Sequence, residues 1–145
     1  LEDIARASHS DSRFYFDEHF GRSSAAALYA IWIRQSCEGS AGAVYVAEVG
    51  GQLVGYVSCN LVPAQRTGQI GLLGVAGAAQ GRGVGQALVH RALEWFADHD
   101  AETVAVVTQG RNTAAQRLYQ RCGFVTRSVQ LWYHRWTLDS TPTQA

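Results

Sequence analysis

The chain contains no lysine and no methionine, and only two of its 145 residues are proline. Its twelve basic residues are all arginines. Schiff-base chemistry and a phosphate-binding loop of the Walker type both need a lysine, so both are excluded. The absence of methionine predicts that the sequence does not begin at its own initiator, and we expect further residues to precede Leu1.

The chain has no excess of charge of either sign. Twelve acidic residues balance the twelve arginines, so no general attraction to nucleic acid or to an anionic membrane is expected. No apolar run approaches the roughly 20 residues of a membrane span, and the first residues are unlike a signal peptide. These patterns predict a soluble cytoplasmic protein with no nucleic-acid or membrane partner, in which any anion site is local.

Cysteine is also scarce. Cys37, Cys59 and Cys122 lie far apart, without the spacing of a metal or redox motif, and are predicted to be buried free thiols of a reducing compartment. The five histidines are scattered too, so no metal site is expected. A hydrophobic content of 47% in a chain of this length favours one domain, placed over residues 1–136, with 137–145 as a frayed tail.

Hydrophobic periodicity predicts the elements of this domain. Helices are expected over 1–10 and 23–37, with Leu28, Ile31, Trp32 and Gln35 on or beside one stripe of the second. A helix after the glycines near residue 83 would turn Val84, Leu88, Trp95 and Phe96 inward. A last helix over 112–122 would be capped by Asn112 and ended by Gly123.

The expected strands alternate with these helices. Residues 43–49 and 52–62 form a hairpin around the Gly50–Gly51 turn. After a loop over 63–68, residues 69–75 and 102–109 are predicted to be buried strands because they lack polar alternation. Residues 124–136 also have strand composition. This order predicts an α/β domain with a mixed sheet.

Three glycines, Gly81, Gly83 and Gly85, stand where a strand leads into a helix. A dinucleotide-binding pattern would need a further glycine at Gln86 or Leu88, so it does not fit. The remaining pattern runs from Gln80 to Gly85, and its unhindered N–H groups would lie at the positive end of the helix dipole, as in sites that hold a pyrophosphate. A strand-to-helix turn without a ligand is the alternative.

A second feature lies downstream of the glycines. Asn112, Ala115 and Tyr119 share one face of the expected helix, with Asn112 and Tyr119 about 10 Å apart along it. One ligand could contact both side chains. The alternative is that Tyr119 packs on the sheet with its hydroxyl satisfied locally.

The segments "GVAGAAQGRGVGQALVHRALEWF" and "NTAAQRLYQRCGF" together resemble the two cofactor motifs of the GNAT superfamily, the acetyl-coenzyme A-dependent N-acetyltransferases. The resemblance spans roughly residues 42 to 136 and implies the mixed α/β fold of that superfamily. The superfamily fold opens with a strand before its first helix, whereas this sequence begins at the helix. We therefore expect the first strand to be absent from this chain or to be supplied from elsewhere.

The resemblance implies a role for each motif residue. A first set would cradle the pyrophosphate of coenzyme A, chiefly through main-chain N–H groups: Gln80, Gly81, Arg82, Gly83, Val84 and Gly85. A second set would pair with the pantetheine arm and place an N–H near the thioester oxygen: Leu73, Gly74 and Val75. Asn112 would hydrogen-bond the same arm, and Tyr119 would stand near the sulfur as the acid that protonates the leaving thiolate. Neither a metal nor a covalent intermediate is needed.

Within the superfamily the chain is most similar to the dTDP-fucosamine acetyltransferases, through residues 12–20, 28–33, 70–75 and 128–133. This implies a small-molecule amine as acceptor, such as the amino sugar of a nucleotide-sugar. One aromatic and basic cluster would either stack a base or sugar and pair with phosphate, or close the first helix over the sheet: Arg13, Phe14, Tyr15, Phe16 and Phe20.

Other functions and the general base remain open from the sequence. The same scaffold serves protein and peptide amino-terminal acetyltransferases, and a coenzyme A-binding module without catalysis is a further alternative. A homodimer is compatible with any of them. Glu48, His19, His134 or a chain of waters could take the proton from the acceptor.

Overall fold

The computed structural model describes residues 1–136, and the tail predicted to be frayed, 137–145, lies outside the described residues. The helices are α1 (Glu2–Ser8), α2 (Arg22–Gln35), α3 (Val84–Asp98) and α4 (Thr113–Arg121). The strands are β1 (Ala43–Val49), β2 (Gln52–Val62), β3 (Thr67–Val75) and β4 (Thr103–Val106). Short helical turns are η1 (Arg13–Phe16), η2 (Ser36–Ser40), η3 (Pro63–Gln65) and η4 (Gly77–Ala79).

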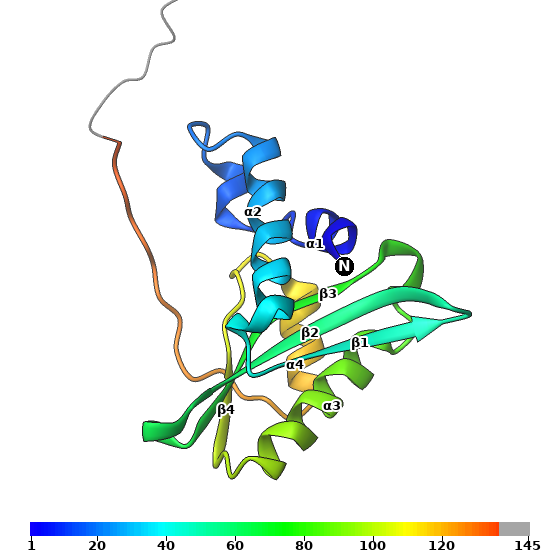
Figure 1. Ribbon diagram of the computed structural model, residues 1–145. Coiled ribbons are helices and arrows are strands. Elements are labelled where there is room, and N and C mark those ends of the chain that lie inside the picture. The colour runs from blue at the N-terminus through cyan, green and yellow to red at the C-terminus, as the bar shows by residue number, and fades with distance from the viewer. Residues whose placement is uncertain (137–145) are drawn as a thin grey trace, which may run out of the picture.

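The described strands form one mixed sheet in the order β1-β2-β3-β4 (Figure 1). β1, β2 and β3 pair antiparallel, and β3 pairs with β4 in parallel. The β1–β2 hairpin has the predicted bounds, because Gly50 and Gly51, at φ +59° and +77°, supply the positive dihedrals of a two-residue turn. The predicted mixed α/β fold is therefore confirmed.

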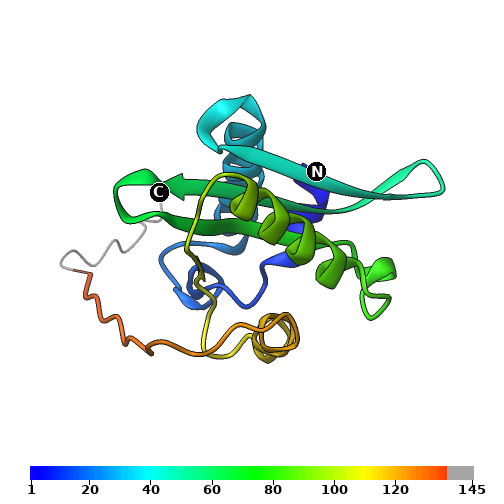
Figure 2. The same ribbon diagram turned by 90° about the horizontal axis from the view of Figure 1, so that it is seen from below.

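Helices cover both faces of the sheet (Figures 1 and 2). α1 and α2 bury Ala5, Tyr29 and Ile33 against Tyr56 on one face. On the other face, α3 and α4 share a larger core with β2 and β3, which includes Leu88, Phe96 and Tyr119. β3 lies between these two layers, so its residues alternate between the two cores.

The predicted stripe of α2 was wrong. The buried residues are Ala25, Tyr29, Ala30 and Ile33, whereas Ile31 and Trp32 are 45% and 37% exposed. The small alanines let α2 approach its neighbours closely, so the buried face follows packing distance rather than side-chain size. Cys37 also differs from its prediction, because it is exposed, whereas Cys59 is buried and Cys122 half-buried.

β4 is shorter and less buried than the strand predicted over 102–109. Only four of those residues form the strand, their burial alternates, and Val107 beyond it is 82% exposed. These apolar residues have a neighbouring strand, β3, on one side only, because β4 is an edge strand over its described length.

The strand predicted over 124–136 is not formed. This segment leaves α4 as an extended chain without a ladder to the described sheet, with Val125 and Leu131 87% and 77% exposed (Figure 1). Its end reaches the turn before α2, where His134 Nε2 lies 3.0 Å from Asp17 Oδ2 and Trp136 Nε1 donates to Asp17 Oδ1. Strand composition produces a strand only where a neighbouring backbone supplies hydrogen-bond partners.

Candidate active site

The parallel pairing of β3 with β4 stops partway along β3. β3 pairs with β4 only from Thr67 to Ile70, but it continues to Val75 while paired with β2 on its other side. The stretch from Gly71 to Val75 therefore has one open edge where no described strand pairs with it. Unpaired backbone donors and acceptors on such an edge can bind an extended ligand as a strand would.

A bulge lies at the start of this open edge. Val57 of β2 pairs with Leu73 and Cys59 pairs with Ile70, so β3 holds one more residue than β2 between these pairs. The buried hydroxyl oxygen of Ser58 accepts a 2.8 Å hydrogen bond from the Leu72 N–H. A Cβ at Gly71 would lie 2.8 Å from Ser58 Oγ, which explains the glycine there. Bulges of this kind re-aim the backbone groups that follow them.

The end of β3 is held by two side chains. The Val75 carbonyl accepts hydrogen bonds from Gln80 Nε2 at 3.1 Å and from Ser8 Oγ at 3.3 Å. The Gln80 backbone N–H is also engaged, because it donates to the Gly77 carbonyl. Gln80 thus shapes the loop in this structure, and its own N–H is not free for a ligand. The sequence had given no signal for the contact from Ser8.

The loop then enters α3 through two glycines with positive φ, Gly81 at +72° and Gly83 at +82°. A Cβ at either position would meet no atom within 4 Å, so both face open space. Gly83 is the N-cap of α3 and no side chain caps it; the first bond into the helix runs from the Ala87 N–H to its carbonyl. The N–H groups of the first turn are therefore available to an anion.

Gly85 has a packing role that the sequence did not distinguish from the other glycines. A Cβ there would lie 3.1 Å from Leu118 Cδ2 of α4 and 3.8 Å from Val75 Cγ2. The absence of a side chain thus lets α4 approach the first turn of α3. Because Tyr119 follows Leu118, this contact brings α4 beside the end of β3.

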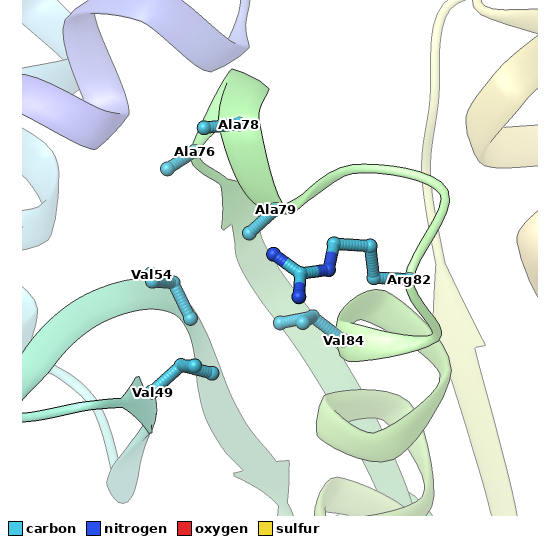
Figure 3. Close-up of a pocket in the computed structure, with 7 residues that line it drawn as sticks. All are labelled: Val49, Val54, Ala76, Ala78, Ala79, Arg82 and Val84. Atoms are coloured by element: carbon cyan, nitrogen blue, oxygen red, sulfur yellow. The ribbon is translucent and has the colours of Figure 1, made fainter.

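Arg82 points away from the open edge of β3. Its guanidinium reaches into a hollow of about 370 Å³ between the loop before α3 and the β1–β2 hairpin, where Val49, Val54 and Val84 form part of the wall (Figure 3). Figure 3 also shows Ala76, Ala78 and Ala79 on the loop side of this hollow. The backbone of Arg82 belongs to the glycine loop, but its side chain serves a separate surface.

Tyr119 is 9% exposed and packs in the same core as Leu73 and Val75. Its ring lies 5.7 Å from that of Phe124. No hydrogen bond within residues 1–136 satisfies its hydroxyl. The hydroxyl oxygen is nevertheless not cut off from solvent in the described part of the chain. Burial raises the pKa of Tyr119 to about 12, so the phenol keeps its proton at neutral pH.

Asn112 caps α4 as predicted. Its Oδ1 accepts a 3.0 Å hydrogen bond from the Ala115 N–H. The helix ends at Arg121, with Cys122 as its C-cap before Gly123, which has φ +87°. Because the cap uses only the carbonyl oxygen, the side-chain NH₂ remains a donor. One ligand could accept from this amide and still reach Tyr119 along the same helix.

The aromatic cluster before α2 is partly buried and partly exposed. Phe14 and Tyr15 pack against the core under α1 and α2, and Phe14 lies 4.8 Å from Phe20. Phe16 is 58% exposed, and the Arg111 guanidinium lies 3.7 Å from the centre of its ring. Part of the cluster therefore closes the fold, whereas Phe16 and Arg111 form an exposed pair next to Asn112.

The three residues considered as the general base lie in two places. Glu48 is exposed near the β1–β2 turn. His19 and His134 both lie beside Asp17. Partial burial would raise the pKa of Asp17, but hydrogen bonds from the His19 backbone, His134 and Trp136 lower it overall.

The described residues contain neither a membrane-spanning helix nor a cluster of metal-binding side chains. Within residues 1–136, no helix is long and apolar enough to cross a bilayer. The same part of the chain holds no group of three or more His, Cys, Asp or Glu side chains placed to bind a metal ion.

Comparisons with known proteins identify the family. The model of the Acetyltransferase (GNAT) family matches residues 4–124. The dTDP-fucosamine acetyltransferase of Escherichia coli O6:H1 is 32% identical over 141 residues, which cover 93% of this chain and 58% of that protein. The spore coat polysaccharide biosynthesis protein SpsD of Bacillus subtilis is 29% identical over 136 residues, or 92% of this chain and 46% of that protein.

A solved structure adds a ligand-bound neighbour. A candidate streptothricin acetyltransferase of Bacillus anthracis, in complex with acetyl coenzyme A, is 27% identical with a TM-score of 0.54, covering 57% of this chain and 46% of that one. The chain belongs to the GNAT family of acetyltransferases. It spans about half the length of the two curated relatives described above.

Proposed function

We propose that this chain transfers an acetyl group from acetyl-coenzyme A to a primary amine of a small molecule. The observation that carries the proposal is the open edge of β3 from Gly71 to Val75, which leads into a glycine loop and the free N–H groups of α3. These features fit acetyl-coenzyme A, whose amide-bearing arm can pair with a strand edge and whose diphosphate suits a helix N-terminus.

The chemistry of the site supports transfer by direct attack. Bound acetyl-coenzyme A supplies an acetyl thioester. Backbone N–H groups on the open edge of β3, around Leu73 to Val75, would stabilise negative charge on the thioester oxygen during attack. Tyr119, which is neutral at physiological pH, would donate its proton to the departing sulfur. Asn112 would hold the arm between these groups through its free NH₂.

An amino-sugar nucleotide is the proposed acceptor. Support comes from the dTDP-fucosamine acetyltransferase, which matches nearly all of this chain, and from the exposed Phe16–Arg111 pair next to Asn112. An aromatic ring and a guanidinium suit a nucleotide because one contributes stacking and the other pairs with phosphate. Within residues 1–136, no carboxylate forms a salt bridge with Arg111, and the proposal pairs its charge with a substrate phosphate.

The test is a thiol-release assay with acetyl-coenzyme A and a panel of acceptors: amino-sugar nucleotides, the free amino sugars, polyamines and peptides. We expect the highest kcat/KM for an amino-sugar nucleotide, at least about tenfold above the free sugar. Arg111→Gln should narrow that difference, whereas Arg117→Gln, a second exposed arginine of the α4 region, should preserve it. A peptide as the best acceptor would contradict the proposed substrate, and acetyl-coenzyme A binding without turnover of any acceptor would contradict catalysis.

A further inference from the structure

His9 ends α1 and lies between two tyrosines of the layer that covers one face of the sheet. Its ring stacks on Tyr29, with centroids 4.2 Å apart and planes inclined by 15°, and its Nε2 lies 3.0 Å from the Tyr56 hydroxyl. The His9 carbonyl accepts a hydrogen bond from the Ser12 N–H. The imidazole is therefore fixed in position, although the residue is only partly buried and retains access to solvent.

These contacts place His9 close to the last residues of β3. Tyr56 pairs in register with Gly74, and its ring lies so close that a Cβ on Gly74 would be 2.9 Å from the Tyr56 hydroxyl oxygen. Ser8, the residue before His9, donates to the Val75 carbonyl. The end of α1 thus meets the two residues of β3 that lead into the glycine loop.

His9 and Tyr119 approach β3 from opposite faces. Tyr119 belongs to the core under α3, together with Leu73 and Val75. Tyr56 and Tyr29, which hold His9, belong to the core under α1 and α2. Acyl transfer needs a proton donor for the leaving sulfur and a separate proton acceptor for the incoming nitrogen.

The surroundings of His9 keep it uncharged. The titratable groups that face the imidazole are Tyr29 from α2 and Tyr56 from β2. Burial raises the pKa of both tyrosines, so both are neutral at physiological pH. Burial lowers the pKa of His9 to about 4, with no contribution from a charged residue of the described chain. At neutral pH the ring is consequently a free base with one nitrogen lone pair available.

We propose that His9 is the general base that accepts a proton from the acceptor amine, with Tyr56 holding the imidazole for this task. The inference rests on the proposed acetyl transfer. The nitrogen of the neutral amine bonds to the acetyl carbon, and the carbon–sulfur bond breaks. As the carbon–nitrogen bond forms, the nitrogen becomes acidic and gives its proton to His9 Nδ1, in the tautomer whose Nε2–H donates to the Tyr56 oxygen. Tyr119 protonates the sulfur, and water then restores both side chains.

His9→Gln is the first test, because the glutamine amide can still reach Tyr56 but accepts no proton. We expect kcat to fall by about 100-fold or more, with the Kd for acetyl-coenzyme A within about twofold of the unchanged protein. His90→Gln is the matched control, since His90 is exposed on α3, and it should retain full activity. Both variants are compared by their Tm as well, so that a folding defect is recognised.

Chemical rescue separates proton transfer from a structural role. His9→Ala leaves space for a small base. Added imidazole should raise the kcat of this variant at least about tenfold, and the increase should depend on the concentration of free imidazole. Unchanged kcat in His9→Gln, or failure of imidazole to restore a well-folded His9→Ala variant, would overturn the role of His9. Failure of the acetyl-transfer proposal is a different result, because the unchanged protein itself would then acetylate no acceptor.

Discussion

The ring of Tyr56 in β2 lies where a side chain on Gly74, its partner in β3, would have to be. The Tyr56 side chain is fully buried, and a Cβ added to Gly74 would lie 2.7 Å from its Cε1 atom. The hydrogen bond between the Tyr56 hydroxyl and His9 holds the ring in this position. Only glycine fits this position of β3, and the backbone there keeps its place beside the open edge.

Gly74→Ala should therefore destabilise the protein by about 1–3 kcal/mol, as expected for an overpacked core. Urea unfolding measures the change. Gly77→Ala is the matched control, because a Cβ there would meet no atom within 4 Å and φ is not positive; its effect should stay within about 0.5 kcal/mol. Equal stabilities for the two variants would show that Tyr56 does not confine this part of β3.

The partly buried imidazole of His9 predicts a specific loss of stability in acid. The ordinary pKa of histidine is about 6.5, and that of folded His9 is about 4. As the pH falls from 6.5 to 4, the unfolded chain binds this proton first, so the contribution of His9 is full above pH 6.5 and is lost towards pH 4. The loss is up to about 3 kcal/mol.

Urea unfolding between pH 7 and pH 4.5 measures this dependence. His9→Gln should flatten the fall in unfolding free energy over that range, whereas His90→Gln should leave it as steep as in the unchanged protein. A slope that is identical in all three proteins would show that folding does not lower the pKa of His9.

Tyr119→Phe tests the acid of the proposed mechanism. Stability should change by less than about 0.5 kcal/mol, because no hydrogen bond of the described residues is lost with the hydroxyl. We expect kcat to fall by about 100-fold while the Kd for acetyl-coenzyme A changes less than about twofold, measured by steady-state kinetics and calorimetry. Unchanged turnover would limit Tyr119 to packing.

Much of the fold follows from local patterns. The β1–β2 hairpin has its predicted bounds because Gly50 and Gly51 dictate a two-residue turn. The buried face of α2 was missed, since Ala25 and Ala30 are buried for their small size while larger Ile31 stays exposed. Residues 124–136 show a second limit: strand composition does not supply a neighbouring strand.

The site was predictable where backbone geometry alone defines it. Gly81 and Gly83 predict positive φ values, and Asn112 predicts a helix cap; the structure has all three. The bulge at Gly71 depends on the register with β2, and the place of His9 depends on how α1 meets Tyr56. Both arise from contacts between distant segments, which periodicity in the sequence does not record.

The central claim, that the loop before α3 holds the diphosphate of acetyl-coenzyme A, is tested most directly by calorimetric titration of two variants at Gly81. Aspartate and asparagine both tolerate the positive φ of this residue, and they have nearly the same shape but differ in charge. We predict that Gly81→Asp binds acetyl-coenzyme A at least about tenfold more weakly than Gly81→Asn, with a difference that shrinks as salt is added. Equal affinity in the two variants at low salt would contradict the claim.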